Sequence, residues 1–339
     1  MRVQRNITAI SWIPSEAVSG AMKMPFELGV SHYDEPPPDA LAPDDLARLQ
    51  EQDRFRFANR LAAWVEFDDA SGRPTAFGYD DSTSTGLIGS TFVFKGRALS
   101  YNFQAFAMPD IQQPPEVLDT GAVRFVQTAG GRTGAPAPRR VRRAPFVQWH
   151  APLAWTTLAL TINADGTSTF VVQGASRFPR HWIYDSDGKL AAKSGMTNFN
   201  EWYRRAFGKH SPWGDADSPA LVTAAETALE RQLSSQLMRA GEKPKIRKLD
   251  AGDVLAREGE PGTELLLVLD GVVRAEKDGE RLAEYGPGAL LGERAILEGG
   301  TRTATLVAVT TLRVAVAEAD AIDRDALREV STGHRHEES

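Results

Sequence analysis

Glycine recurs so often in the last third of the chain that long helices have little room there. Between residues 242 and 292, glycines stand at positions 252, 259, 262, 271, 279, 286, 288 and 292. The apolar runs between them, such as 264–269 (ELLLVL), have the length of strands. Asp278-Gly279 separates two such runs and is typical of a tight hairpin. About eight short strands in about 75 residues predict a small β jelly roll, which we place in a domain at 241–333.

The first 190 residues also have the pattern of a β-rich domain. Apolar and polar residues alternate over 99–107 and 156–162, and Asp-Gly pairs at 165–166 and 187–188 indicate turns. Further strand candidates lie at 61–67, 88–95, 121–128, 145–150 and 167–173. We therefore expect a mainly β protein whose N-terminal domain, 1–215, is an antiparallel sandwich or barrel.

Few helices are expected. One is predicted at 43–53, one at about 198–207, and a connector helix at 218–240. The connector has Ser218 as N-cap, Pro219 at its first position and Gly241 at its end. Its apolar residues recur every four positions, at Ala225, Leu229, Leu233 and Leu237. This single stripe suits packing on a neighbouring domain or dimerisation. Residues 334–339 are expected to be a flexible tail.

Composition limits the classes of protein that remain. The chain has 339 residues, which favours two domains, and its net charge of −6 is not that of a nucleic-acid binder. It contains no cysteine, so disulfides, thiolate metal sites and cysteine nucleophiles are excluded. No apolar run approaches the roughly 18 residues of a membrane-spanning helix, and no signal peptide is evident. We therefore expect a cytoplasmic protein without membrane contact.

The stretch 292–308 (GERAILEGGTRTATLVA) carries the clearest site chemistry. A short helix starting near Gly292 would present free amides, which attract an anion. Glu293 is suited to accept hydrogen bonds from a diol, and Arg302 to contact a phosphate. Gly299 and Gly300 would turn the chain so that these groups meet. The combination predicts a pocket for a ribose that carries a cyclised phosphate.

At these residues the chain resembles the cyclic nucleotide-binding domain family, which includes the catabolite activator protein, kinase regulatory subunits and gated channels. The family's motif, Gly-Glu-x-Ala-hydrophobic followed by Arg-(Ala/Ser/Thr)-Ala-Thr-hydrophobic, is matched from Gly292 to Leu306, and the resemblance covers about 245–318. It implies that Glu293 binds the ribose 2′-hydroxyl and Arg302 the phosphate, assisted by the amides of Gly292, Glu293 and Thr303. The implied ligand is cAMP or cGMP, between which Thr303 does not decide. No cofactor, metal or catalytic residue is expected.

Two features leave alternatives open. Glu293 and Arg302 could instead form a structural ion pair in a domain that has lost nucleotide binding. After the last strand, 312–317, only a short helix at about 322–330 is expected, without room for a helix-turn-helix. Nucleic acid is therefore not expected as a partner, and a signal from the pocket would pass through the 218–240 helix. That helix could also form a homodimer.

The first 215 residues show no known catalytic motif. His150, His181 and His210 are scattered. Asp185 and Asp187 are interpreted as a hairpin turn in preference to a cation site, and Asp80-Asp81 as part of a polar loop. An acid-free segment at 131–143 contains Arg132, Arg139, Arg140, Arg142 and Arg143, which we interpret as a solvated loop in preference to an anion-binding one. We expect a regulatory protein that senses a cyclic nucleotide. The alternatives are a nucleotide-regulated enzyme with a ligand-binding N-terminal barrel, or a scaffold with a degenerate sensor.

Overall fold

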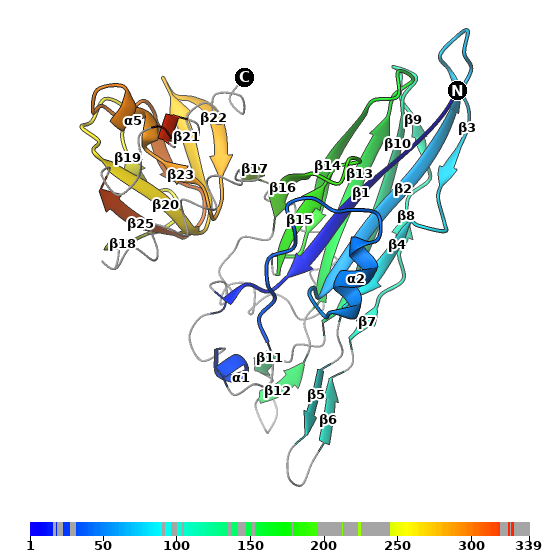
Figure 1. Ribbon diagram of the computed structural model, residues 1–339, viewed down its shortest axis with the longest axis horizontal. Helices are drawn as coiled ribbons and strands as arrows, with labels where there is room; N and C mark the ends of the chain where they lie inside the picture. Colours follow the sequence, from blue (N-terminus) through cyan, green and yellow to red (C-terminus); the bar gives the residue numbers. More distant parts are fainter. Residues whose placement is uncertain are drawn as a thin grey trace. The chain divides into compact units, whose positions relative to one another are not determined.

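The computed structural model describes most of the chain outside the 195–244 segment. The described residues are 1–15, 18, 23–27, 32–89, 92–95, 100–103, 105–133, 137–140, 147–150, 153–177, 179–194, 212, 223–224, 245–318, 325 and 327–328. They divide into two units: Met1–Gly195 with Phe199–Leu221, and Met196–Asn198 with Val222–Ser339. Figure 1 labels the elements of both, and each unit is described by itself.

The first unit is an antiparallel β-sandwich, as expected. One sheet has the order β16-β15-β1-β2-β3, with β4 also on β2. Its strands are β1 (Arg2–Trp12), β2 (Phe57–Phe67), β3 (Pro74–Tyr79), β4 (Thr85–Ile88), β15 (Arg180–Tyr184) and β16 (Leu190–Ser194). The other sheet has the order β14-β13-β10-β7, with β8 and β9 also on β10. Its strands are β7 (Phe106–Ala107), β8 (Ile111–Gln112), β9 (Glu116–Val117), β10 (Val123–Arg132), β13 (Leu153–Ile162) and β14 (Ser168–Ala175).

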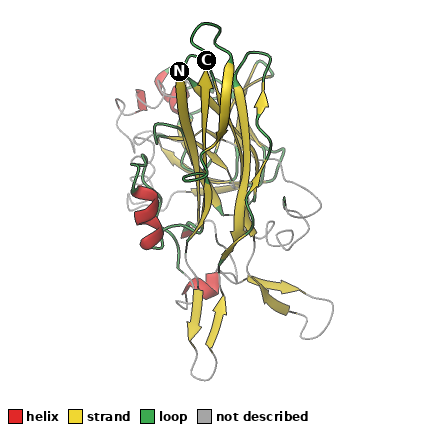
Figure 2. Cartoon of the chain, turned by 90° about the vertical axis from the view of Figure 1, so that its right-hand side faces the viewer, coloured by secondary structure: helices red, strands yellow, loops and turns green. Residues whose placement is uncertain are grey.

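Smaller elements surround the sandwich. Two hairpins are formed by β5 (Phe92–Lys95) with β6 (Ser100–Phe103), and by β11 (Ala137–Arg140) with β12 (Val147–His150). Figure 2 shows the layered strands with the helices outside them. These helices are α1 (Met24–Glu27) and α2 (Asp45–Glu51), and α2 confirms the helix expected within 43–53.

The core of the sandwich lies between the two sheets, where β2 contacts β10 and β13, and β1 contacts β13. Large apolar side chains from both sheets fill this layer and are fully buried, among them Ile7, Leu61, Phe125, Leu158 and Leu160. The turns at Asp165-Gly166 and Asp187-Gly188 are also confirmed, with positive φ angles of 84° at Gly166 and 75° at Gly188. Glycine adopts this conformation without the penalty that a side chain would bring.

Two strand predictions need correction. The alternating run 99–107 is not one strand, because β6 pairs with β5 whereas β7 pairs with β10 in another sheet. The run 88–95 likewise spans the end of β4 and the separate strand β5. Alternation in a sequence shows that a strand is favourable but not which neighbour it pairs with.

The second unit is the expected jelly roll. Its sheets have the orders β18-β25-β20-β23 and β19-β24-β21-β22. The elements are β18 (Lys245–Leu249), β19 (Val254–Ala256), β20 (Glu264–Asp270), β21 (Val273–Lys277), β22 (Glu280–Tyr285), β23 (Leu290–Leu291), α5 (Glu293–Leu297), β24 (Thr305–Ala308) and β25 (Leu312–Glu318). The hairpin predicted at Asp278-Gly279 joins β21 to β22, with φ of 51° and 82° at these two residues. Two consecutive positive φ angles are what a two-residue hairpin turn requires.

Strand β20 shows how this unit builds a core on both faces of one sheet. Leu266 and Val268 belong to the cluster between the two sheets. Leu265 and Leu267 point the other way and pack with Leu327, which is itself fully buried. Residues 325, 327 and 328 are helical, within the short helix expected at 322–330.

The connector helix predicted at 218–240 is wrong at the two residues of this range that the structure describes. Thr223–Ala224 form a short strand, β17. The rest of the range, the helix expected at 198–207 and the tail 334–339 lie outside the described residues. No helix among the described residues has the length and apolar character needed to cross a membrane.

Candidate functional site

The site begins where β23 ends and the chain turns into α5. Gly292, which separates them, has a φ of 90°, in the left-handed region. A Cβ built on Gly292 would lie 2.3 Å from Nη1 of Arg302 and 2.9 Å from the carbonyl oxygen of Glu264. Glycine is therefore needed here both for the turn and for the close approach of the arginine. The first amides of α5 point away from the helix body, where an anion would be favoured.

Arg302 lies beside this helix start, held by its backbone and by a second glycine. Its amide donates to Glu260 O (2.8 Å), and its carbonyl accepts from the Gly259 amide (2.9 Å). A Cβ at Gly262 would lie 2.2 Å from Nε of Arg302. Gly262 and Gly292 therefore leave the space that the guanidinium fills, and a side chain at either position would displace it.

The guanidinium of Arg302 is buried but has hydrogen-bonding capacity left over. The residue is 7% exposed, and its side chain makes one hydrogen bond among the described residues, from Nη1 to Glu264 O (3.0 Å). A guanidinium has five N–H donors. Within the part of the chain that the structure describes, Arg302 forms no ion pair, so the structural Glu293–Arg302 ion pair considered from the sequence is not what positions it.

The electrostatic surroundings of Arg302 are mixed. Burial is the main influence and lowers the pKa of its guanidinium, and the nearby Arg247 acts in the same direction. Glu264, Glu293 and Glu260 raise that pKa. An arginine stays charged at neutral pH under such influences, so the pocket contains a buried positive charge with donors available to an anion.

Glu293 occupies the first position of α5 and is 3% exposed. It lines one open pocket together with Gly292, Arg302 and Thr303, all four site residues predicted from the sequence. The pocket is open to solvent, and about 440 Å³ of space lies within it and in front of it. The other lining residues are Ala275, Tyr285, Leu291, Arg294, Ala295, Ala304 and Leu306, so the remaining wall is mostly apolar.

The Gly299-Gly300 pair returns the chain as expected. Both residues have positive φ, 114° and 82°. The Gly300 amide donates to Ala295 O, and its carbonyl accepts from the Gly262 amide (2.8 Å). The pair thus closes α5 and connects it to the segment that holds Arg302.

Some residues of the site were not singled out from the sequence. The carbonyl oxygen of Glu264 and the side chain of Tyr285 come from β20 and β22, outside the motif. Every residue has a backbone carbonyl, so the residue type at position 264 does not reveal this acceptor. Tyr285 lies at the end of a strand, where an aromatic residue is common and does not by itself indicate a site. Gly262 was noticed as part of the glycine pattern, but its contact with Arg302 was not predicted.

The scattered N-terminal candidates have structural roles where the structure describes them. His181 is fully buried, with Nδ1 2.7 Å from Ser11 Oγ and Nε2 2.7 Å from Ser176 O. Burial lowers the pKa of its imidazole to about 4. Oδ1 of Asp185 accepts hydrogen bonds from the Asp187 and Lys189 amides, which is a turn contact. The carboxylate of Asp80 accepts hydrogen bonds from the hydroxyls of Ser82 and Thr83, which is likewise a local contact.

The arginine-rich segment is not only a loop. Residues 137–140, including Arg139 and Arg140, form β11, which corrects the prediction of a loop there. Residues 134–136 and 141–146, with Arg142 and Arg143, lie outside the described residues, as do His210 and the side chain of His150. No group of three or more His, Asp or Glu residues in the described ranges is placed to hold a metal ion.

Comparisons with known proteins agree with the geometry of the second unit. Residues 246–327 match the cyclic nucleotide-binding domain family. The chain is 40% identical over 68 residues to a cyclic nucleotide-gated potassium channel of Mesorhizobium japonicum, covering 20% of this chain and 19% of the channel. It is 33% identical over 78 residues to a cAMP-dependent protein kinase regulatory subunit of Hypocrea atroviridis, covering 23% of this chain and 17% of that protein.

Among solved structures, a cyclic nucleotide-binding domain from Methylobacillus flagellatus is 25% identical. The match covers 32% of this chain and 67% of that one, with a TM-score of 0.23. The chain spans less than a quarter of the length of the two curated relatives named above. Residues 246–327 of this chain are a cyclic nucleotide-binding domain.

Proposed function

We propose that the second unit binds cAMP or cGMP in the pocket beside α5 and thereby regulates the first unit. The observation that carries the binding proposal is the buried guanidinium of Arg302, which makes one hydrogen bond within the described part of the chain and faces the pocket. Its free donors suit the two oxygens of a cyclic phosphodiester, which a guanidinium contacts in a bidentate manner. The α5 amides add donors to the same anion.

Glu293 takes the role of ribose ligand in this proposal. Its carboxylate is an acceptor at the edge of the pocket, and a ribose 2′-hydroxyl is a donor. The apolar wall, including Leu291 and Leu306, covers the base. Thr303 also lines the pocket, and its hydroxyl is the feature that would favour the hydrogen-bonding edge of guanine over that of adenine.

Calorimetric titration of the full chain with cAMP and with cGMP tests the binding proposal. We expect saturable binding of at least one nucleotide, and its loss in Arg302→Ala. Arg281→Ala is the matched control, because Arg281 is an exposed arginine of the same unit whose partner is Glu284. Absence of heat with both nucleotides, from a wild-type chain shown to be folded by circular dichroism, would refute the proposal.

Thr303→Val separates the two nucleotides. The substitution keeps the size of the side chain and removes its hydroxyl. If Thr303 contacts the guanine edge, the affinity for cGMP falls by about 5- to 10-fold, and that for cAMP stays unchanged. An equal change for both nucleotides would show that Thr303 does not determine the base preference.

Regulation of the first unit is the second part of the proposal. Its support is that the matched segment makes up only 19% of the channel and 17% of the kinase regulatory subunit named above, so in both it is one part of a longer protein. Hydrogen exchange of residues 1–195, measured with and without saturating nucleotide, tests it. We expect altered exchange rates in the first unit. Unchanged rates would contradict its regulation by the nucleotide but not the binding of the nucleotide by the second unit. A cytoplasmic location stays a prediction, and so does a homodimer through residues 218–240.

A further inference from the structure

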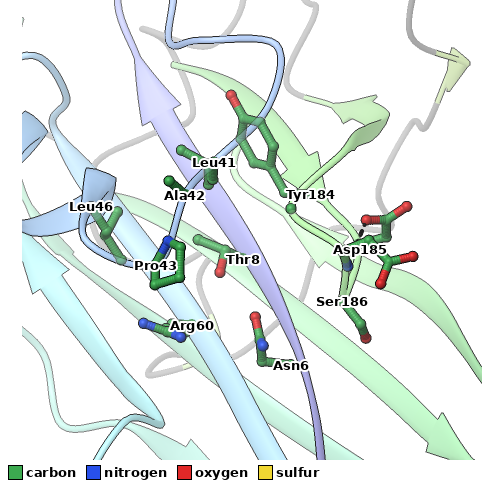
Figure 3. Close-up of a pocket in the computed structure, with 12 residues that line it drawn as sticks. Asn6, Thr8, Leu41, Ala42, Pro43, Leu46, Arg60, Tyr184, Asp185 and Ser186 are labelled. Atoms are coloured by element: carbon green, nitrogen blue, oxygen red, sulfur yellow. Dashed lines mark hydrogen bonds between the residues drawn. The ribbon is translucent and has the colours of Figure 1, made fainter.

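A second pocket lies on the first unit, on the outer face of the sheet that contains β1 and β2 (Figure 3). Asn6 and Thr8 of β1 and Arg60 of β2 form its floor. Thr8 and Arg60 are direct partners across the two strands, and alternate residues of a strand share a face. The neighbouring Asn59 points the other way, since its amide donates to Thr156 Oγ1 of the opposite sheet (3.1 Å). The pocket and its mouth enclose about 580 Å³.

Backbone hydrogen bonds hold the walls of this pocket in place. One wall is the loop at 41–43 together with α2, and the other is the turn at 185–188. The Leu41 amide donates to Gly188 O (2.8 Å), and the Leu190 amide to Asp39 O (3.1 Å). A Cβ at Gly188 would lie 2.2 Å from Leu41 O. The two walls are therefore held together by backbone contacts of the fold itself.

The floor offers hydrogen-bond donors that the fold does not use. Within the described ranges, the Arg60 guanidinium donates to no acceptor, and its Nε is buried without a partner. The carboxyl of Asp80 lies near Arg60, whose charge adds to the hydrogen bonds from Ser82 and Thr83 in lowering the pKa of that carboxyl. The side chains of Asn6 and Thr8, which lie beside Arg60 in Figure 3, form no hydrogen bond to any described residue. A partly buried guanidinium with unused donors favours a planar oxyanion.

The walls of the pocket indicate which class of oxyanion fits it. Asp185 and Asp187 stand on the opposite wall, and their negative charge disfavours a multiply charged anion such as phosphate. The wall over Arg60 is apolar and suits a hydrocarbon chain; it consists of Leu41, Ala42, Pro43 and Leu46. Singly charged carboxylates with a short apolar body satisfy both walls.

We propose that this pocket binds a small monocarboxylate. The carboxylate accepts two hydrogen bonds from Arg60 and further ones from Asn6 and Thr8, and the hydrocarbon part packs against Leu41 and Leu46. The ligand site would make the first unit a small-molecule receptor in its own right. The proposal does not depend on nucleotide binding by the second unit.

Ligand-observed NMR of the full chain with pentanoate tests the proposal. We expect saturable binding, no competition from pentan-1-ol, which lacks the charge, and weaker competition from inorganic phosphate. Arg60→Gln is expected to lower the affinity for pentanoate by about 10- to 100-fold, since a charge-assisted contact is lost. Thr8→Val, which removes only a hydroxyl, is a second variant with a smaller expected loss.

Two controls make the result specific. Arg124→Gln makes the same exchange on β10 in the other sheet and should keep the wild-type affinity. Arg302→Ala removes the guanidinium of the nucleotide pocket and should also keep it. Three results would overturn the proposal: no saturable signal, equal affinity in wild type and in both floor variants, or tighter binding of phosphate than of pentanoate. Tryptophan fluorescence of each variant checks that the first unit is folded.

Discussion

The two units use buried polar side chains in opposite ways. In the first unit, His181 has hydrogen-bond partners at both ring nitrogens, and Asp34 pairs with Arg56 through both carboxylate oxygens. In the second, Arg302 is almost as buried but uses one donor on a backbone carbonyl. A buried polar group whose hydrogen bonds are satisfied inside the fold stabilises the fold, whereas one with donors left over has hydrogen bonds available to a ligand. Burial alone therefore does not identify a binding site.

The comparison can be measured because the tryptophans report on one unit only. All seven tryptophans of the chain precede residue 222. Tryptophan fluorescence during urea unfolding therefore follows the first unit. Scanning calorimetry also detects the unfolding of the second unit, which has no tryptophan.

Asp34→Ala should have the largest effect. The side chains of Asp34 and Arg56 are 0% and 4% exposed, and Asp34 also accepts a hydrogen bond from the Ile13 amide (2.7 Å). Removing the carboxylate leaves a buried guanidinium without its ion-pair partner, which costs about 3–5 kcal/mol. Urea unfolding followed by tryptophan fluorescence measures this, with the exposed Asp187→Ala as control. A loss below about 1 kcal/mol would mean that the pair is not essential to the sandwich.

Acid should destabilise the first unit through His181. Because the folded state lowers the pKa of this imidazole from 6.5 to about 4, folding favours its neutral form. The contribution is complete above pH 6.5 and is lost as the pH falls towards 4, by up to about 3 kcal/mol. Unfolding in urea at several pH values measures the slope. His181→Asn should flatten the slope in this range, and an unchanged slope would assign the pH dependence to other groups.

Asn59→Ala tests the polar contacts between the two sheets. Asn59 is fully buried, donates to Thr156 O (3.0 Å) and accepts from Gln127 Nε2 (2.9 Å). Its loss leaves Gln127 with an unsatisfied donor, for an expected cost of about 1–3 kcal/mol. Fluorescence-detected unfolding measures the cost. If Asn59→Ala and the double variant Asn59→Ala/Gln127→Ala unfold alike, the two side chains act as one unit.

Arg302→Ala should have the smallest effect on stability. The side chain makes one hydrogen bond within the described residues and is desolvated, so its removal should change the stability of the second unit by no more than about 1 kcal/mol. Scanning calorimetry of the nucleotide-free chain measures this. If Arg302→Ala lowered the free energy of unfolding as much as is expected for Asp34→Ala, Arg302 would be a residue that stabilises the fold. The contrast between the buried polar residues of the two units would then be contradicted.

Local signals predicted much of the second unit. Asp278-Gly279 and Gly299-Gly300 adopt the positive φ angles that their residue types favour. The motif also predicted which residues lie close together, since Gly292, Glu293, Arg302 and Thr303 line one pocket. These residues lie within a short stretch of chain, where turn chemistry determines the geometry.

Predictions failed where distant partners decide the structure. The run 99–107 divides between two sheets, and Thr223–Ala224 are extended although the spacing around them favours a helix. Pairing between strands overrides such local preferences. The pocket around Arg60 was also not foreseen, because its floor needs the register that places Thr8 opposite Arg60.

The strand-rich architecture, the turns and the motif from Gly292 to Leu306 could be predicted from the residue order alone, since glycine conformations and motif spacing are properties of neighbouring residues. The folded structure was needed to show that Gly262 and Glu264 confine Arg302, that His181 and Asp34 have hydrogen-bond partners inside the sandwich, and that Nε of Arg60 has none among the described residues. The physical reason is that a side chain's unused hydrogen bonds depend on which distant strands surround it, and no local pattern records that.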